Sequence, residues 1–550
     1  MLETIKVKIK GKTYSYSKDI TLQEIANEHQ EKFNYPIILA RINNKIHELT
    51  YPVKEDCDIE FIDLTSRVGN RCHISGLTYI MVYAIKKLFG KKENVMVHHS
   101  LGKGLYVETT FKLTEEKLKQ IKETMKNIIG ADMPFTKVVI DRIEAMKYFE
   151  NNNDFAKAGV LKYNTNGYVK LYRLGNTYDY FYGYMAPSTG KVKDFDLTYL
   201  NEKGFVLRYP TVYSPEKIPP YVHQPNMYDA YKEVRDLAKI MNVTNSVELN
   251  KIVTTGKVCD LIRIEEAMKS AKLLEVAKQI SAKKNVKIIL VAGPSSSGKT
   301  TSSRKLCMYL QSFGINPKLI SMDDYFVEKE DTPLDENGKP DYECLEAVDT
   351  KLFDKQMAQL LNGEKITIPT YNFALGKKEF KSHMQMEPND VLVIEGIHAL
   401  DTRVLTNIDK KYKFKVYISA LTELNMDDHN RICTSDNRLM RRIIRDNRTR
   451  GYSVDVTLNL WPSVRNGEEK YIFPYQEEAD ATINSALIYE IGVLKTYVEP
   501  LLYSVPTDSP HYEEAKRLIN LLRLFLPIPS DSIPQDSILR EFIGGSCFHE

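Results

Sequence analysis

The sequence predicts a multidomain protein whose first half is α+β and whose second half is α/β. Its 550 residues correspond to three or four domains at about 150 residues each. Up to residue 225, short alternating strands mix with amphipathic helices. From residue 286, apolar strands alternate with helices, the order typical of a parallel sheet flanked by helices. We therefore expect domains at 1–64, 65–225 and 286–550, with a helical connector at 226–285.

Composition excludes several functional classes. Hydrophobic residues make up 43% of the chain and charged residues 27%, which rules out a largely disordered or collagen-like protein. The 76 Lys and Arg nearly balance the 73 Asp and Glu, so the net charge does not indicate a nucleic acid or an anionic membrane as partner. The N-terminus has no apolar signal segment, and no run of 18 apolar residues occurs. We expect a cytoplasmic protein without a membrane span.

The cysteines also indicate a cytoplasmic protein. There are seven, an odd number, scattered along the chain without a CxxC pair. This argues against a disulfide framework or a Cys-rich zinc site and fits a reducing compartment.

Residues 1–64 have the pattern of a small self-contained unit. Ile5, Val7 and Ile9 alternate with lysines, as in a half-buried strand, and TYSYS can pair back on it as a hairpin. Thr21 and Glu24 have the spacing of a helix capping box. Two further strands, PIILARI and DIEFIDL, complete a β-β-α-β-β order that suggests a ubiquitin-like roll.

Residues 65–225 predict an α+β domain. Apolar positions recur at helical spacing over about 74–89, and a second helix covers EEKLKQIKETMKNII. The segments YVKLYRLGNTYDYF and APSTGKVKDF are typical of short strands joined by turns.

The segment GPSSSGKT fits the phosphate-binding pattern G-x-x-x-x-G-K-[ST] and lies between an apolar strand and a helix, the context that this motif requires. Backbone N–H groups of such a loop form an anion nest at a helix N-terminus. Lys299 would neutralise the β- and γ-phosphates and Thr300 would ligate Mg²⁺. The predicted ATP-binding set is Gly293, Ser295, Ser296, Ser297, Gly298, Lys299, Thr300 and Thr301.

Carboxylates follow two other strands of the α/β region. Asp323 and Asp324 come directly after LIS, and Glu395 ends VLVIEG. Beside a phosphate loop, such groups activate a hydroxyl nucleophile or hold Mg²⁺. The Asp pair could equally cap the following turn, and a lone Glu before Gly could be a turn residue.

An arginine stripe follows later in the chain. Arg438, Arg441, Arg442 and Arg445 recur at i, i+3, i+4 and i+7, which places them on one helix face, and Arg450 follows before a glycine. Four like charges on one face require anions opposite, and ATP phosphates under a closing lid would supply them. A solvated face or an RNA contact is the alternative.

Together these ordered motifs resemble the uridine kinase and phosphoribulokinase family of P-loop kinases. SMDDYF resembles the family motif D-x-[FY]-[YFH], which implies that Asp323 is the catalytic base and contributes to the metal site. VLVIEG resembles the strand that ends in a Mg²⁺-associated Glu, here Glu395. SDNRLMRRIIRDNRTRG resembles the lid D-x-R-L-x-R-R-x-x-R-D-x-x-x-R-G. The lid likeness implies a substrate contact for Arg438, catalytic roles for Arg441 and Arg445, and phosphate or lid roles for Arg442 and Arg450.

The acceptor side resembles uridine kinases less closely. DYECLEAVD resembles N-F-D-H-P-x-A-x-D and IPTYNF resembles P-x-Y-D-F, which implies substrate contacts for Tyr342, Glu343, Tyr371 and Phe373. The departures are Glu343 for Asp, Leu345 for Pro, Asn372 for Asp and Gly376 for a base-reading His. Phosphate-handling positions are kept and base-reading positions are not, so the base preference stays open.

The first half resembles parts of threonyl-tRNA synthetases. Residues 1–64 resemble a TGS domain, and residues 65–225 resemble the editing domain through AIKKLFG, KGLYVE and LYRLGNTYD. The editing site's H-x-x-x-H pair and its later Cys and His correspond here to Ser75, Tyr79, Phe181 and Met185. We therefore expect neither aminoacyl-ester hydrolysis nor a metal there. The nearby pair His98 and His99 could ligate a metal, but a hydrogen-bonded pair is the favoured interpretation.

The sequence as a whole predicts a nucleoside kinase that uses ATP and Mg²⁺ and phosphorylates a ribonucleoside 5′-hydroxyl. Two alternatives stay open: a kinase of another small hydroxylated metabolite, and an ATPase switch that binds tRNA or the ribosome through the N-terminal domains. The family resemblance also leaves a homo-oligomer open.

Overall fold

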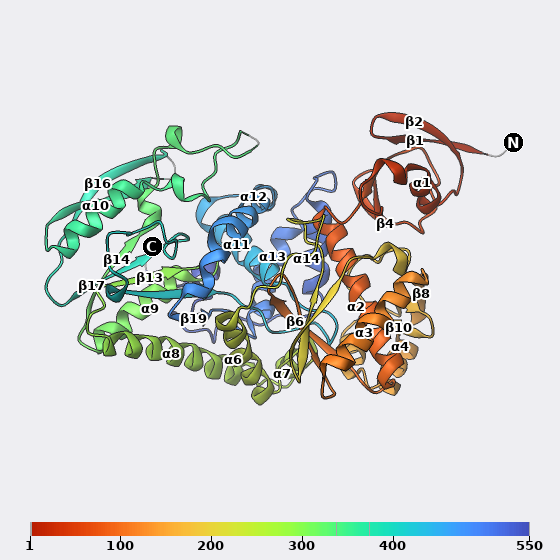
Figure 1. The fold of residues 1–550 in the computed structure, drawn as a ribbon, viewed down its shortest axis with the longest axis horizontal. Helices are drawn as coiled ribbons and strands as arrows, with labels where there is room; N and C mark the ends of the chain where they lie inside the picture. The colour runs from red at the N-terminus through yellow and green to blue at the C-terminus, as the bar shows by residue number, and fades with distance from the viewer. Residues whose placement is uncertain (1–2, 165, 337, 373–374, 549–550) are drawn as a thin grey trace.

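The computed structural model describes residues 3–164, 166–336, 338–372 and 375–548 (Figure 1). At the N-terminus, strands pair in the order β2-β1-β5-β3-β4, and the buried residues of α1 share a core with this sheet. The elements are β1 (Thr4–Ile9), β2 (Lys12–Ser17), α1 (Leu22–His29), β3 (Leu39–Ile42), β4 (Lys45–Glu48) and β5 (Cys57–Ile62).

The local sequence signals of this unit are confirmed. Strand β1 buries every second residue, as its alternation predicts. The capping box is present, since Thr21 Oγ1 accepts from the Glu24 N–H and the Glu24 carboxylate accepts from the Thr21 N–H at 2.8 Å. The predicted β-β-α-β-β order missed β4. A tight turn with positive φ at Asn43 and Asn44 starts this strand, and asparagine tolerates that conformation.

The next region carries two antiparallel sheets, in the orders β11-β12-β7-β6 and β10-β9-β8. Its helices are α2 (Arg67–Phe89), α3 (Glu115–Gly130), α4 (Arg142–Asn151) and α5 (Phe155–Lys162). Its strands are β6 (Val95–Leu101), β7 (Gly104–Thr109), β8 (Thr136–Asp141), β9 (Tyr168–Leu174), β10 (Thr177–Asp179), β11 (Asp196–Asn201) and β12 (Gly204–Arg208).

The start of one helix and the presence of one strand in this region differ from the sequence prediction. Helix α2 begins seven residues before the predicted start, because the Ser66 hydroxyl caps it by accepting from the Gly69 N–H at 3.0 Å. The strand predicted for APSTGKVKDF is wrong. The Asp132 carboxylate accepts from the Gly190 N–H and the Ser188 hydroxyl, which folds this segment into a short 3₁₀ turn against α3.

The helical prediction for 226–285 agrees with α6 (Pro225–Met241), α7 (Ser246–Thr254) and α8 (Val258–Ala282). These helices are integrated into the second half of the molecule. Leu273 and Ile280 of α8 share a core with Ile289 and Val291, so α8 covers one face of the parallel sheet. Helices α6 and α7 contribute to the core that surrounds α11.

The second half is built on a parallel sheet in the order β14-β17-β13-β18-β19 (Figure 1). Its strands are β13 (Ile288–Ala292), β14 (Asn316–Ser321), β17 (Asp390–Glu395), β18 (Lys413–Ser419) and β19 (Ala481–Asn484), with a separate hairpin of β15 (Ile366–Asn372) and β16 (Lys377–Met384). The helices are α9 (Lys299–Ser312), α10 (Thr350–Leu361), α11 (Thr434–Arg450), α12 (Val454–Gly467), α13 (Glu490–Leu502), α14 (Tyr512–Leu522) and α15 (Arg540–Ile543). The predicted parallel α/β architecture is confirmed here.

Within the described residues, the helices are all too short or too polar to cross a membrane.

Candidate active site

The phosphate loop joins β13 to α9 at the carboxyl end of the parallel sheet. Ser296 and Gly298 have φ values of 57° and 82°, which turn the chain toward the helix N-terminus. Gly293 is packed so closely that a Cβ would lie 1.9 Å from the Ile418 carbonyl oxygen. Among the described residues, no hydrogen-bond partner is found for the buried hydroxyls of Ser296 and Ser297. These unpaired donors, with the first N–H groups of α9, fit an anion such as a nucleotide phosphate.

Lys299 and Thr300 begin α9 and face the carboxylate of Glu395. The Thr300 hydroxyl donates to Glu395 Oε1 at 3.2 Å, and the Lys299 ammonium donates to the Pro294 carbonyl oxygen at 3.3 Å. Burial raises the pKa of Glu395 to about 7, although the charge of Lys299 lowers it. A partly buried carboxylate with a hydroxyl beside it is a suitable donor set for Mg²⁺.

Asp323 follows β14 in a short 3₁₀ turn, Met322–Tyr325. Its side chain is reached by solvent, but the surrounding protein still removes enough water to raise its pKa. The positive charges of Lys299, Arg450 and Arg445 act in the opposite direction. The neighbouring Asp324 has a different partner, since it accepts from the Tyr371 N–H at 3.2 Å. Of the two aspartates, Asp323 is therefore the one that faces the phosphate-loop cations.

Arg438 and Arg441 are the most deeply buried of the predicted lid arginines, and both face protein acceptors. Arg438 is 1% exposed, pairs with Glu468 and donates to the Ser295 carbonyl oxygen at 3.0 Å. Arg441 is fully buried and donates to Glu490 Oε2 through Nε at 3.0 Å. Both guanidinium groups thus support the phosphate loop through contacts within the protein. This geometry favours a positioning role over the substrate contact predicted for Arg438 and the catalytic contact predicted for Arg441.

The other three arginines lie closer to open solvent and share one counter-ion. Arg442, Arg445 and Arg450 all pair with the buried carboxylate of Asp446, at distances of 2.9–3.3 Å. Arg442 also donates to the Ser295 hydroxyl at 2.9 Å. Three cations beside the phosphate loop and Asp323 thus share the carboxylate of Asp446.

The predicted acceptor residues form an aromatic row beside the partly buried carboxyl group of Glu343. The ring of Phe326 contacts those of Tyr342 and Tyr371, with centroids 6.3 and 5.7 Å apart. Burial raises the pKa of Glu343 to about 7, while Arg442 lowers it and Asp323 raises it. Phe373 lies outside the described residues. Sequence reasoning missed Phe326, although its position at the end of SMDDYF could have indicated it.

The sequence comparison with editing domains aligned Tyr79, Phe181 and Met185 with metal-ligand positions. In this structure, these three side chains are packed in a core. Tyr79 is buried, accepts from the Leu174 N–H at 3.0 Å and lies 5.4 Å from the ring of Phe181. Phe181 and Met185 belong to the same core. The relation of this region to editing domains, and of residues 1–64 to TGS domains, stays a prediction from sequence.

The histidine pair lies at the junction between the two halves. His99 Nδ1 is 2.7 Å from Glu423 Oε1, and His98 Nε2 is 3.2 Å from Glu108 Oε2. Burial lowers the pKa of both histidines. Glu423 comes from the loop between β18 and α11, so these contacts tie β6 and β7 to the loop that precedes the arginine helix.

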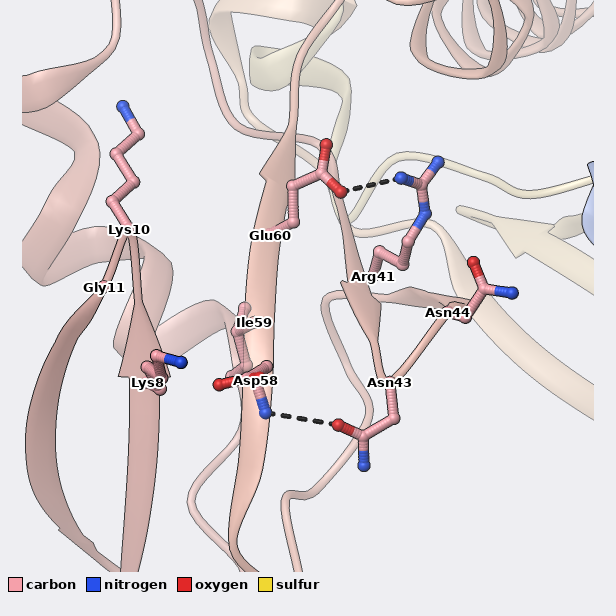
Figure 2. Close-up of a pocket in the computed structure, with 9 residues that line it drawn as sticks. All are labelled: Lys8, Lys10, Gly11, Arg41, Asn43, Asn44, Asp58, Ile59 and Glu60. Carbon is pink, nitrogen blue, oxygen red and sulfur yellow. Dashed lines mark hydrogen bonds and ion pairs between the residues drawn. The ribbon is translucent and has the colours of Figure 1, made fainter. Parts of the chain in front are cut away.

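A cavity of about 410 Å³ opens on the N-terminal sheet (Figure 2). Figure 2 shows Arg41 paired with Glu60 at 2.7 Å, while Lys8 and Lys10 lie across the sheet from them. Asp58 and Glu60 on the central strand β5 lie between the basic residues of β1 and β3. The charges therefore alternate in sign across this face.

A phosphate loop after β13, with Glu395 at the end of the adjacent strand β17 and Asp323 after β14 on the far side of β17, is an arrangement suited to phosphoryl transfer by a P-loop enzyme. The family model described as "Phosphoribulokinase / Uridine kinase family" matches residues 288–491. Proteins named uridine kinase from Staphylococcus aureus strains JH9 and Newman are each 30% identical over 197 residues, which is 36% of this chain and 86% of theirs. Through this region, the chain belongs to the phosphoribulokinase/uridine kinase family.

Solved structures resemble a part of the chain. A putative fructose transport system kinase from Silicibacter sp. TM1040 is 18% identical, with a TM-score of 0.30, covering 38% of this chain and 98% of that one. A possible uridine kinase from Bacillus stearothermophilus is 20% identical, with a TM-score of 0.26, covering 39% of this chain and 98% of that one.

Proposed function

We propose that this protein is an ATP-dependent nucleoside kinase, which transfers the γ-phosphoryl group of ATP to the 5′-hydroxyl of a ribonucleoside. One observation carries the proposal: Asp323 faces Lys299, Arg445 and Arg450 at the strand ends beside the phosphate loop. Membership of the family supports a phosphoryl transfer to an alcohol, and the relatives named uridine kinase favour a nucleoside as acceptor.

The residues present suit ATP with Mg²⁺. The nest of Gly293–Thr301 would hold the phosphates, and Thr300 with Glu395 would hold the metal, with Asp323 nearby. When bound, Mg²⁺ supplies positive charge to the phosphate oxygens. Because Glu395 must be ionised to ligate a cation, the positive charge of Lys299 helps to prepare it.

The chain's own groups then have defined tasks. Asp323 accepts the proton of the acceptor hydroxyl, and its raised pKa makes it a better base than an ordinary aspartate. Lys299, Arg445 and Arg450 stabilise negative charge on the transferred group. Tyr342, Phe326 and Tyr371 provide flat apolar surfaces for a nucleobase, and Glu343 provides a polar contact. Catalysis by this site is mainly positioning and electrostatic stabilisation.

The test is conversion of ATP to ADP against a panel of ribonucleosides, deoxynucleosides and sugar phosphates. The variant Asp323→Asn should lower kcat by about 10²–10⁴ because it removes the base. Asp324→Asn is the matched control: its amide oxygen can still accept from the Tyr371 N–H, so we expect a kcat close to wild type.

The panel also decides between the proposed function and its alternatives. Nucleoside-dependent turnover that Asp323→Asn abolishes would establish the proposal and name the base. Turnover with only a sugar phosphate or another hydroxylated metabolite would keep the mechanism and change the substrate class. Turnover that is independent of any acceptor and unchanged in Asp323→Asn would contradict the kinase and favour an RNA-linked ATPase switch.

A further inference from the structure

The C-terminal segment 530–548 follows the family-matched region and packs against the phosphate loop. Ile538 touches Gly298 so closely that a Cβ on this glycine would lie 2.4 Å from Ile538 Cγ2. Helix α15 contacts the arginine helix α11. Through these two contacts, the described part of this segment forms one wall of the candidate active site.

One carboxylate of this segment lies on the phosphate-binding helix. Glu541 Oε2 accepts from the Thr301 N–H at 3.2 Å and from the Thr301 hydroxyl at 2.8 Å. Thr301 is the third residue of α9, and the N–H groups of the first turn have no partner within a helix. A carboxylate here uses the same donors, and brings the same charge, as a phosphate oxygen would.

The charge of Glu541 also acts on Glu395, at the candidate metal site. Together with the charge of Asp323, it raises the pKa of Glu395, so these acidic groups lie in one electrostatic environment. A nucleotide arriving with its phosphates would therefore meet like charge from Glu541, besides finding the Thr301 donors already satisfied.

The structure also provides a place for this side chain to go. A cavity of about 210 Å³ lies between α9 and the C-terminal segment, and its lining includes Glu541, Arg304, Arg448 and Arg540. Arg448 holds the backbone of the segment by donating to the Glu541 carbonyl oxygen at 2.9 Å. The carboxylate can thus rotate from Thr301 toward the arginines while α15 keeps its position.

We propose that Glu541 is an autoinhibitory latch, whose carboxylate occupies a phosphate position on α9 and must move aside before a nucleotide binds. The proposal rests on the nucleotide site proposed above. It makes the C-terminal segment a regulator of nucleotide affinity, because any contact that draws Glu541 toward the arginine-lined cavity opens the site.

The test is calorimetric titration of the full-length protein with ADP and Mg²⁺, which measures binding without turnover. Glu541→Gln keeps the shape of the side chain and removes its charge. We expect it to lower the Kd for ADP about tenfold, the effect of about one charge-assisted hydrogen bond. Asp531→Asn is the matched control, since it removes the same charge from an exposed position on the same segment. Its Kd should equal that of the wild type.

The other outcomes overturn the latch in distinguishable ways. Equal affinity of the wild type and Glu541→Gln would show that the carboxylate does not compete, while the nucleotide site itself would stand. Weaker binding by Glu541→Gln would make Glu541 a nucleotide contact. Binding by none of the proteins would remove both the latch and the proposed kinase, whereas equal tightening in Asp531→Asn would reduce the effect to net charge.

Discussion

The buried pair of Arg441 and Glu490 offers a direct test of whether the arginine helix braces the phosphate loop. We consider Glu490→Gln, which preserves the shape of the side chain and removes its charge. Arg441 is fully buried and Glu490 is 1% exposed, so the guanidinium would keep its charge without a counter-ion. Removing one partner of such a pair costs about 3–5 kcal/mol. We expect the free energy of unfolding of the C-terminal core to fall by this amount.

The chain provides its own probe for this measurement. Trp461 on α12 is the only tryptophan, is 5% exposed, and belongs to the same hydrophobic core as α11 and α13. Its fluorescence during urea unfolding therefore reports on this core alone, which matters because a multidomain chain does not unfold in one step. The matched control is Arg445→Ala, whose side chain is 18% exposed and whose loss should shift the transition by less than about 1 kcal/mol.

A transition that stays within about 1 kcal/mol of wild type in Glu490→Gln, together with lost turnover, would refute the reasoning. It would mean that Arg441 is poised for the phosphates and that the ion pair is incidental. A shifted transition with ADP binding weakened in proportion would support bracing, because Arg441 also reaches the Ser296 carbonyl oxygen of the phosphate loop at 3.5 Å.

Three further predictions follow from the same geometry. Arg445→Ala should lower kcat by about 10²–10³ through lost charge stabilisation, and an unchanged kcat would contradict its assignment. Burial raises the pKa of Glu423 from its ordinary value of 4.5 to about 7, so the stability it confers is present below pH 4.5 and lost as the pH rises through 7. Thermal melts should therefore show Glu423→Gln gaining stability relative to wild type between pH 5 and 8, by up to about 3 kcal/mol, and a pH-independent difference would be inconsistent with this. Lys157→Met should remove the lysine from the buried carboxylate of Asp179, which keeps its contact with His429 at 2.8 Å, and should lower stability by up to about 3–5 kcal/mol; an unchanged melting temperature would exclude the Lys157–Asp179 pair as a structural element.

The structural features that could be predicted from the sequence are those determined by residues close together in the chain. The phosphate loop combines a fixed spacing with a flanking strand and helix, and local physics decides its shape. The same holds for the capping box of α1 and for the alternation in β1, where one side chain in two is buried. Each of these depends on neighbours within a few positions, so a single sequence is sufficient to predict them.

The partners of the arginine stripe could not be predicted in this way. A helical stripe of arginines requires anions opposite, but the pattern does not say whether phosphates or protein carboxylates supply them. Glu468 and Glu490 lie 30 and 49 residues after their arginines, and Glu541 lies 240 residues after Thr301. Such pairings depend on how α12, α13 and the C-terminal segment pack, which local periodicity does not specify.

The contacts between the two halves extend this argument to the role of the N-terminal half. The loop between β18 and α11 is held by β6, since the Val97 N–H donates to the Asp428 carbonyl oxygen at 2.8 Å and Asn425 Nδ2 donates to the Val97 carbonyl oxygen at 2.9 Å. His429, in the same loop, is buried against Asp179 at 2.8 Å. Helix α11 begins only a few residues later and carries the arginines that brace the phosphate loop. These contacts therefore join the first half of the chain to the loop that leads into α11, a connection between distant segments that local periodicity does not specify.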